Sequence, residues 1–206
     1  MDATTKGLVY LGSAAVILLI GWRVLANKQV PFARKVICIG DSITANGGYV
    51  RELKRLLGPE NSVRKFGYPG EGVKYISGKL PSAMMQGATD VVIQAGVNDL
   101  ASGRSEATIK THLASMVDYA HSHGARAVLI EVLPWGAHHR GRNLLPETHE
   151  INRWMRYDSL ADKVVSGSSM GDFEGDLKSE YDSGDHLHLN NAGQKKLGEL
   201  VYAKGF

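Results

Sequence analysis

Apolar and polar positions alternate along most of the chain in a pattern typical of buried strands separated by helices. Three short runs are apolar at nearly every position, as expected for strands covered on both faces: residues 35–40, 90–95 and 126–132. Two weaker strand candidates, residues 62–66 and 163–165, lie among them. The pattern therefore predicts five strands after residue 34.

The stretches between and after these strands show the apolar spacing of amphipathic helices. The expected helices are one ending near Gly58 with Tyr49, Val50, Leu53, Leu56 and Leu57 on its apolar face, one capped by Ser105 and stopped by Gly124, one over about residues 148–160, and one opening at Asn191 with Gln194 three residues later as in a capping box. Because strand and helix alternate five times, we predict an α/β fold, a three-layer α/β/α sandwich around a five-stranded, parallel, flavodoxin-like sheet.

The N-terminal residues differ from the rest of the chain. Residues 7–22 carry no charge, and the apolar character continues past Arg23 to Ala26, so residues 7–26 form a candidate membrane-spanning or signal helix. An anchor requires the Arg23 charge to reach the interface, whereas a secretory signal would use Val24 and Ala26 as its small-residue cleavage pattern. We expect residues 1–34 to be this anchor or signal with a linker, and residues 35–206 to be one folded domain.

The basic residues around this segment bear on where the folded domain lies. Lys6 precedes the segment, and four basic residues follow its apolar core: Arg23, Lys28, Arg34 and Lys35. A literal positive-inside count would leave the domain in the cytoplasm. A short N-terminal stretch before a single anchor more usually stays inside, however, so we expect the domain to be membrane-anchored or exported, outside the cytoplasm.

Composition and charge exclude several classes of function. The net charge is +3, and no run of Lys and Arg that could follow a phosphate backbone occurs, which argues against nucleic-acid binding. Cys38 is the only cysteine, so the chain has no internal disulfide and no zinc site built on thiolates. The hydrophobic share of 43% and the charged share of 22% are typical of a globular protein.

Residues capable of chemistry follow the predicted strands rather than precede them. Gly40-Asp41-Ser42 follows the first strand, residues 67–72 the second, residues 96–99 the third, and residues 185–188 the fifth. In parallel α/β sheets the ligand crevice lies beyond the carboxyl ends of the strands. We therefore expect these four clusters to meet at one edge of the sheet.

These clusters resemble the blocks of the SGNH (GDSL) hydrolase family over about residue 35 to the C-terminus. Ser42 lies in a Gly-Asp-Ser block, Asn98 in a Gly-x-Asn-Asp block and His188 in an Asp-x-x-His block. Gly70 matches the glycine block, although the Asn that often precedes that glycine is missing. Gly67 is therefore an alternative to Gly70.

The resemblance implies a serine ester hydrolase that needs no cofactor. Ser42 would be the nucleophile, His188 the general base and then acid, and Asp185 the group that orients the His188 ring. The oxyanion would be held by the backbone N–H groups of Ser42 and Gly70 and by the Asn98 side chain. Asp41 and Asp99 are expected to be structural, bonding backbone N–H groups in their turns.

Two other sets of residues remain to be placed. Asp185, His186 and His188 have the residue types of a metal site, an alternative that would leave Ser42 and Asn98 without roles. Trp135, His138 and His139 follow the fourth strand and are candidates for the rim of an acyl or sugar site.

The leading hypothesis is hydrolysis of small acyl esters, with the O-acetyl groups of cell-envelope polysaccharide as the favoured substrate if the domain is exported. One alternative is a non-catalytic module that binds glycans in the same crevice. Another is an acyltransferase that uses the same triad and passes the acyl group to a hydroxyl instead of water.

Overall fold

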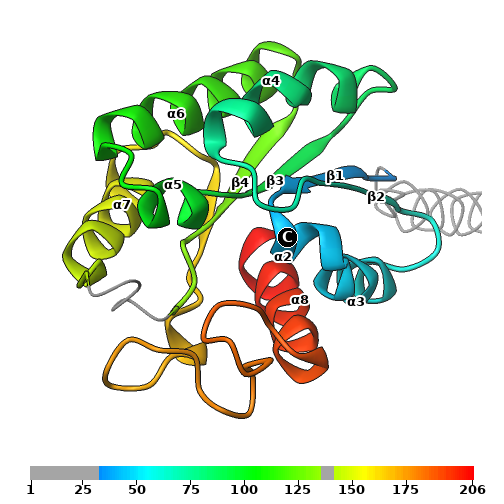
Figure 1. The fold of residues 1–206 in the computed structure, drawn as a ribbon. Coiled ribbons are helices and arrows are strands. Elements are labelled where there is room, and N and C mark those ends of the chain that lie inside the picture. Colours follow the sequence, from blue (N-terminus) through cyan, green and yellow to red (C-terminus); the bar gives the residue numbers. More distant parts are fainter. Residues whose placement is uncertain (1–32, 136–141) are drawn as a thin grey trace, which may run out of the picture. The chain divides into compact units, whose positions relative to one another are not determined.

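The computed structural model describes residues 33–135 and 142–206, which form a parallel β-sheet between two layers of helices (Figure 1). The strands are β1 (Lys35–Gly40), β2 (Ser62–Gly67), β3 (Asp90–Gln94), β4 (Arg126–Ile130) and β5 (Lys163–Val165). They pair in the order β2-β1-β3-β4-β5, and every pairing is parallel. The predicted five-stranded parallel sheet is confirmed, with β3 one residue and β4 two residues shorter than expected.

Helices cover both faces of the sheet. The α3 (Gly48–Leu57) and α8 (Asn191–Gly205) helices pack on one face, and α4 (Val73–Met84), α6 (Glu106–Ser122) and α7 (Leu145–Tyr157) pack on the other (Figure 1). Two short helices, α2 (Ser42–Asn46) and α5 (Val97–Ala101), directly follow β1 and β3, and a 3₁₀ turn (Ser168–Met170) follows β5.

The strand β1 shows why the apolar runs form buried strands. Val36 and Cys38 point into the core with α3 and α8, while Ile37 and Ile39 point into the core with α4 and α6. Successive side chains of a strand face opposite sides, so a sheet covered on both faces needs apolar residues at nearly every position.

Arg34, near the start of the described domain, takes part in its packing. The Arg34 guanidinium and that of Arg126 both bond the carboxylate of Asp90, which is fully buried at the start of β3. The Arg34 N–H also donates to the Asn61 side chain at 2.8 Å. Two cations thus compensate a buried charge that would otherwise be costly.

Three details of the helices differ from expectation. The α4 helix was not expected, since Gly78 and Pro81 interrupt its pattern, and α7 begins at residue 145 instead of 148. The cap of α8 is Asn190, whose side chain accepts a hydrogen bond from the Gly193 N–H at 2.9 Å. Gln194 therefore takes no part in a capping box.

The predicted membrane or signal segment, residues 7–26, lies outside the described residues. Within residues 33–135 and 142–206, no helix is both long enough and apolar enough to cross a bilayer.

Candidate active site

The predicted nucleophile lies at the point where the chain connections leave the sheet in opposite directions. Ser42 follows β1 as the first residue of α2, and Asn98 follows the neighbouring strand β3 in α5. The connection after β1 runs to helices on one face and the connection after β3 to helices on the other. Such a switch point leaves a crevice beyond the strand ends, where ligands bind in this architecture.

Ser42, His188 and Asp185 form a continuous chain of hydrogen bonds. The Ser42 Oγ lies 2.8 Å from the His188 Nε2, and the His188 Nδ1 lies 2.6 Å from the Asp185 Oδ2. Ser42 and His188 are partly exposed, so a substrate can reach the hydroxyl. The arrangement allows the imidazole to accept the serine proton while a carboxylate orients the ring.

The loop before α8 holds the Asp185 carboxylate in place. Its Oδ1 accepts hydrogen bonds from the backbone N–H groups of His188 and Leu187 at 2.7 and 3.1 Å. Partial burial alone would raise the pKa of Asp185, but hydrogen bonds from the His188 ring and these N–H groups outweigh it and hold that pKa below its usual range. The carboxylate is therefore ionised at neutral pH.

His186 does not join this group. Its Nδ1 instead lies 3.2 Å from the Asp182 carboxylate. Across the described part of the chain, no three His, Cys, Asp or Glu side chains are arranged to hold a metal ion. The geometry thus offers no support for the metal alternative.

A buried polar network lies beneath the nucleophile. Asp41 accepts a hydrogen bond from the Ile43 N–H at 2.9 Å and one from the Gln94 amide at 3.2 Å. Gln94 in turn accepts from the Thr44 hydroxyl, which shares a hydrogen bond with the Tyr49 hydroxyl. Burial raises the pKa of Asp41 from 3.8 to about 6, against the opposing effect of the Ile43 and Gln94 hydrogen bonds. Asp41 caps α2 as expected, while the rest of the network was not anticipated.

Gln194 links the nucleophile helix to α8. Its Oε1 accepts from the fully buried Tyr49 N–H at 2.8 Å, and its amide donates to the Ile43 carbonyl at 3.3 Å. These two bonds join the segment that carries Ser42 to the helix that follows His188.

The two glycine candidates occupy different surroundings. A Cβ on Gly67 would lie 2.2 Å from the Ala45 Cα, so Gly67 is needed for the close approach of β2 to α2. Gly70 has a φ of +76° and open space where a Cβ would be, and it faces the same cavity as Asn98. This placement favours Gly70 over Gly67 as the residue that faces a substrate.

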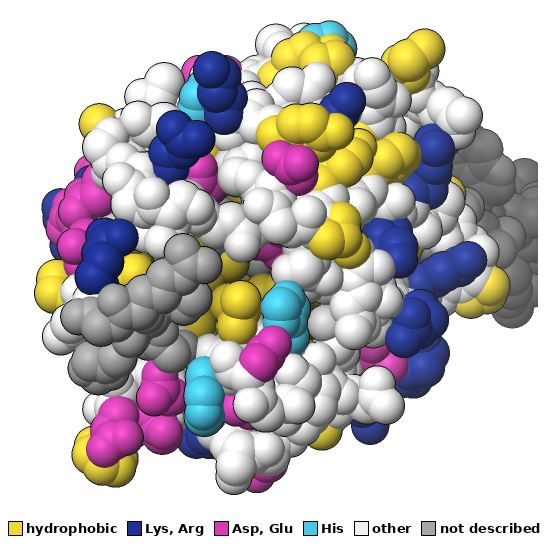
Figure 2. Space-filling view, viewed as in Figure 1, with side chains coloured by type: hydrophobic (Ala, Val, Ile, Leu, Met, Phe, Trp, Pro, Cys, Tyr) yellow, Lys and Arg dark blue, Asp and Glu magenta, His cyan; other side chains and the backbone are white. Residues whose placement is uncertain are grey.

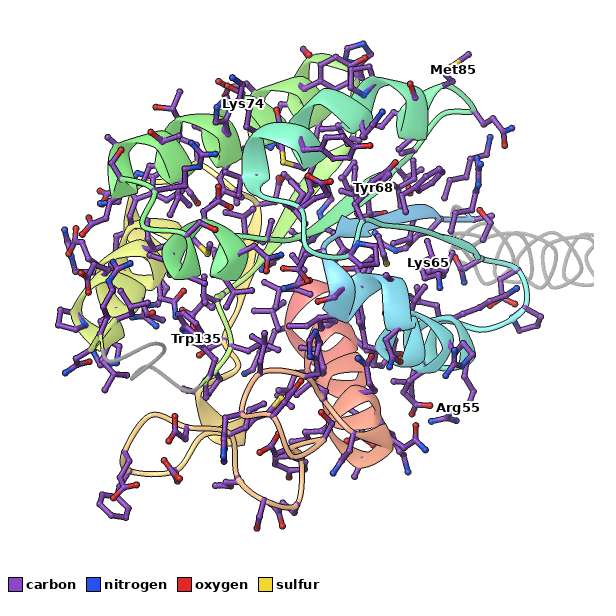
Figure 3. The ribbon with its side chains drawn as sticks, in the orientation of Figure 1. Arg55, Lys65, Tyr68, Lys74, Met85 and Trp135 are labelled. Atoms are coloured by element: carbon purple, nitrogen blue, oxygen red, sulfur yellow. The ribbon has the colours of Figure 1, made fainter. Side chains whose placement is uncertain are left out.

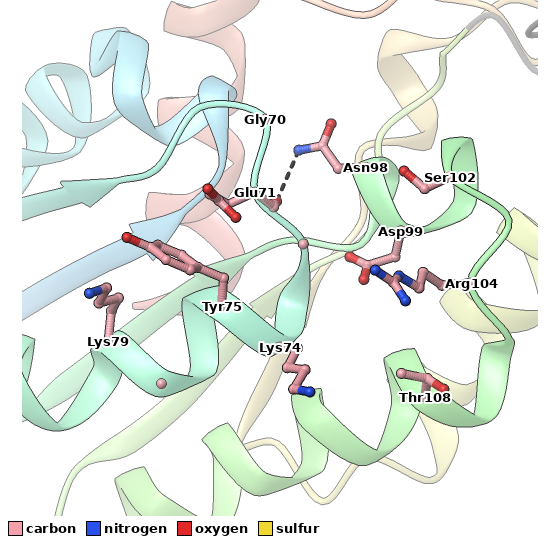
Figure 4. Close-up of a pocket in the computed structure, with 12 residues that line it drawn as sticks. Gly70, Glu71, Lys74, Tyr75, Lys79, Asn98, Asp99, Ser102, Arg104 and Thr108 are labelled. Atoms are coloured by element: carbon pink, nitrogen blue, oxygen red, sulfur yellow. Dashed lines mark hydrogen bonds between the residues drawn. The ribbon is translucent and has the colours of Figure 1, made fainter.

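Asn98 and Asp99 tie the glycine loop to α5. The Asn98 Nδ2 donates to the Glu71 carbonyl at 3.0 Å (Figure 4). The Asp99 Oδ2 accepts from the Val73 N–H at 2.8 Å. Asp99 therefore caps α4 from a neighbouring helix, in keeping with its expected structural role.

Of the three predicted rim residues, the structure describes only Trp135. Trp135 lies inside the fold between the end of β4 and α7 (Figure 3), is 3% exposed, and its indole Nε1 donates to the Thr148 hydroxyl at 3.1 Å. Trp135 faces a cavity of about 260 Å³ beside β4, whereas Gly70 and Asn98 face another of about 570 Å³. His138 and His139 lie outside the described residues.

Comparisons with known proteins agree with this architecture. The profile of the GDSL-like lipase/acylhydrolase family matches residues 38–196. A search of curated proteins finds no match.

Several solved structures share the fold at low sequence identity. The lipase/acylhydrolase from Enterococcus faecalis is 22% identical with a TM-score of 0.68, over 82% of this chain and 94% of that one. A GDSL-like lipase from Bacteroides thetaiotaomicron is 19% identical with a TM-score of 0.66, over 82% and 86%. A member of the lipolytic protein G-D-S-L family from Veillonella parvula is 14% identical with a TM-score of 0.64, over 83% and 97%.

Proposed function

Because the chain belongs to the GDSL-like lipase/acylhydrolase family, we propose that it is a serine ester hydrolase that forms an acyl-enzyme on Ser42. The earlier resemblance to the SGNH hydrolases is confirmed at the level of the family. The observation that carries the proposal is the chain of hydrogen bonds from the Ser42 Oγ through the His188 ring to the Asp185 carboxylate, at 2.8 and 2.6 Å.

The proposed reaction proceeds in two halves. The Ser42 Oγ attacks the ester carbonyl as the His188 Nε2 takes its proton, and the resulting oxyanion accepts hydrogen bonds from the N–H groups of Ser42 and Gly70 and from Asn98. Collapse of this intermediate breaks the bond to the alcohol, which receives the proton from His188. In the second half, water attacks the acyl-enzyme carbonyl as the His188 Nε2 takes its proton. The bond to the Ser42 Oγ then breaks, Ser42 receives the proton, and the acid is released.

The test is labelling with a fluorophosphonate, which reacts with an activated serine hydroxyl. We expect wild-type protein to be modified at Ser42 and Ser42→Ala to remain unlabelled, with circular dichroism showing that both are folded. Folded wild-type protein that takes up no label would refute the proposal and favour a non-catalytic glycan-binding module.

We propose short acyl esters as substrates, with the O-acetyl groups of cell-envelope polysaccharide first among them. This part of the proposal draws support from residues 7–26, which would place the domain outside the cytoplasm. Release of free acetate from an acetylated polysaccharide is the expected result. Recovery of the acetyl group on an added acceptor would instead indicate an acyltransferase.

That location is itself open to experiment. If residues 7–26 direct the domain out of the cytoplasm, protease added to intact cells or spheroplasts should degrade residues 35–206. Protection of the domain until the cells are lysed would overturn the proposed location and leave the esterase proposal intact.

A further inference from the structure

The cavity beside the proposed oxyanion site is large and lies outside the triad itself. It has a volume of about 570 Å³ and opens between the start of α4, the short helix α5 and the start of α6. Gly70 and Asn98 form its inner edge, and the residues drawn in Figure 4 surround it. A substrate whose carbonyl oxygen lies between Gly70 and Asn98 would extend directly into this space.

The charged side chains around the cavity are mainly cations. Lys74 and Lys79 come from α4, and Arg104 comes from the turn before α6. Among the described residues, no carboxylate forms an ion pair with any of these three within 4.0 Å. The Arg104 charge acts on the buried Asp99 carboxylate. Three cations still outnumber the two carboxylates around this hollow, which gives it a positive potential that attracts anions.

The two carboxylates of the cavity do not cancel this charge equally. Asp99 is only 4% exposed, and its oxygen is engaged by the Val73 N–H at the start of α4. Glu71 is the one carboxylate on a partly exposed side chain there, and it lies in the loop beside Gly70 (Figure 4). Arg104 is therefore partly offset by Asp99, while Lys74 and Lys79 face one accessible carboxylate.

The cavity also has an aromatic edge. Tyr75 is 44% exposed, its ring packs edge-on against Tyr68 at 5.6 Å, and the Lys79 ammonium lies 4.8 Å from the Tyr75 ring centre. Figure 2 shows hydrophobic side chains gathered over the α4 side of this face, with Lys and Arg on either side of them. A flat ring beside positive charge suits a cyclic substrate that carries an anionic group.

We infer that this cavity binds the alcohol part of the substrate, and that this alcohol carries a carboxylate or phosphate group. A hydrocarbon acyl chain would gain little among Lys and Arg side chains, whereas an anion gains charge-assisted hydrogen bonds from them. Arg104 supplies a planar pair of donors, and Lys74 supplies a point charge across the cavity. This inference rests on the proposed esterase function and names its substrate class.

The experiment compares matched acetyl esters that differ in charge. The anionic esters are 3-acetoxybenzoate and 3-acetoxyphenyl phosphate, and the neutral one is 3-acetoxybenzamide. For the wild type we expect a KM about tenfold lower for the anionic esters, which corresponds to one or two modest charge interactions. The preference for carboxylate or phosphate identifies which anion the cavity suits.

Variants locate the preference in the cavity. In the double variant Lys74→Gln/Arg104→Gln the difference in KM should fall below about twofold, through a rise in the KM of the anionic esters. The matched control Lys54→Gln/Lys195→Gln removes two exposed cations on α3 and α8, outside this cavity, and should keep the wild-type preference. Absence of a preference in the wild type, or its persistence in the double variant, would overturn the inference.

A binding measurement separates this inference from the proposed function. Titration of the product analogue 3-hydroxybenzoate, followed by NMR, should show binding to wild type and to Ser42→Ala and weaker binding to the double variant. If no ester is hydrolysed but this difference holds, the esterase proposal fails and the anion site stands. If esters are hydrolysed without any such difference, the anion site fails alone.

Discussion

Replacing Asn98 by Ala tests the proposed oxyanion site most directly. One hydrogen of the Asn98 amide is engaged by the Glu71 carbonyl at 3.0 Å, and the amide carries a second hydrogen for a substrate oxygen. The variant therefore removes one structural hydrogen bond and one proposed catalytic donor at the same time.

The two losses differ greatly in size. A single neutral hydrogen bond contributes about 1 kcal/mol to the free energy of unfolding, which for a domain of this length lowers Tm by about 2–4 °C. Removal of one oxyanion donor typically lowers kcat about 100- to 1,000-fold, or about 2.7–4 kcal/mol in activation free energy. We expect Asn98→Ala to lower kcat in this range with little change in KM or stability.

The assay is the steady-state hydrolysis of phenyl acetate, with Tm followed by circular dichroism. Asn61→Ala is the matched control, since the Asn61 amide also donates to a backbone carbonyl, that of Leu57 at 2.7 Å, and its oxygen accepts from the Arg34 N–H. This control should lower Tm at least as much and leave kcat unchanged. A kcat for Asn98→Ala within about threefold of wild type would refute the oxyanion role.

Three further outcomes follow from the packing around the site. Gln194→Ala should lower the free energy of unfolding by about 1–3 kcal/mol in chemical denaturation, because the Tyr49 N–H is left buried without its partner. Gly67→Ala should destabilise the fold far more than Gly70→Ala, since only the former places a Cβ against backbone atoms; Tm values compare the two. Because burial raises the folded-state pKa of Asp41 from 3.8 to about 6, the folded protein binds more protons, and the free energy of unfolding should fall as pH rises through this range.

Each of these outcomes has a control. Lys195→Ala alters an exposed neighbour of Gln194 on the same helix and should leave stability nearly unchanged; an equal loss in both variants would contradict the role of Gln194. A Gly70→Ala variant less stable than Gly67→Ala would contradict the packing argument. In Asp41→Asn the fall in stability between pH 4 and 6 should be smaller than in wild type, and an unchanged pH profile would show that another group titrates there.

The strands were predictable because both faces of the sheet are covered. Even the weak candidate at residues 163–165 has the same bounds as β5. Where strand and helix alternate, a strand is expected between two predicted helices. The clusters after these strands were expected to meet at one edge, and the Ser42, His188 and Asp185 side chains do lie in contact there.

What could not be predicted depends on contacts between distant segments. Pro81 disfavours a helix locally, but burial of Val73, Ile76 and Leu80 against the sheet stabilises α4 in spite of it. Gln194 resembled a capping residue because it lies three residues after Asn191. Its actual partner, the Tyr49 N–H, is 145 residues away and cannot be inferred from local spacing. Trp135 was interpreted as a rim residue, since the sequence does not reveal that Thr148 accepts a bond from its indole.

Gln94 in the third strand could have indicated the buried polar network from the sequence alone. Gln94 follows the apolar residues 91–93 of β3, and a buried amide needs partners on neighbouring segments. Its position level with Gly40, just before Ser42, would have indicated a network beneath the nucleophile.

The two helical layers have different roles in the proposed enzyme. Ser42 and His188 belong to segments of the α3 and α8 layer, while the large cavity is formed by α4, α5 and the start of α6. Residues at the cavity surface, such as Lys74 and Arg104, can therefore change over evolution without disturbing the proton relay. Duplicated copies of such a gene can acquire new ester preferences one surface residue at a time, and directed evolution of this protein should begin with the same helices.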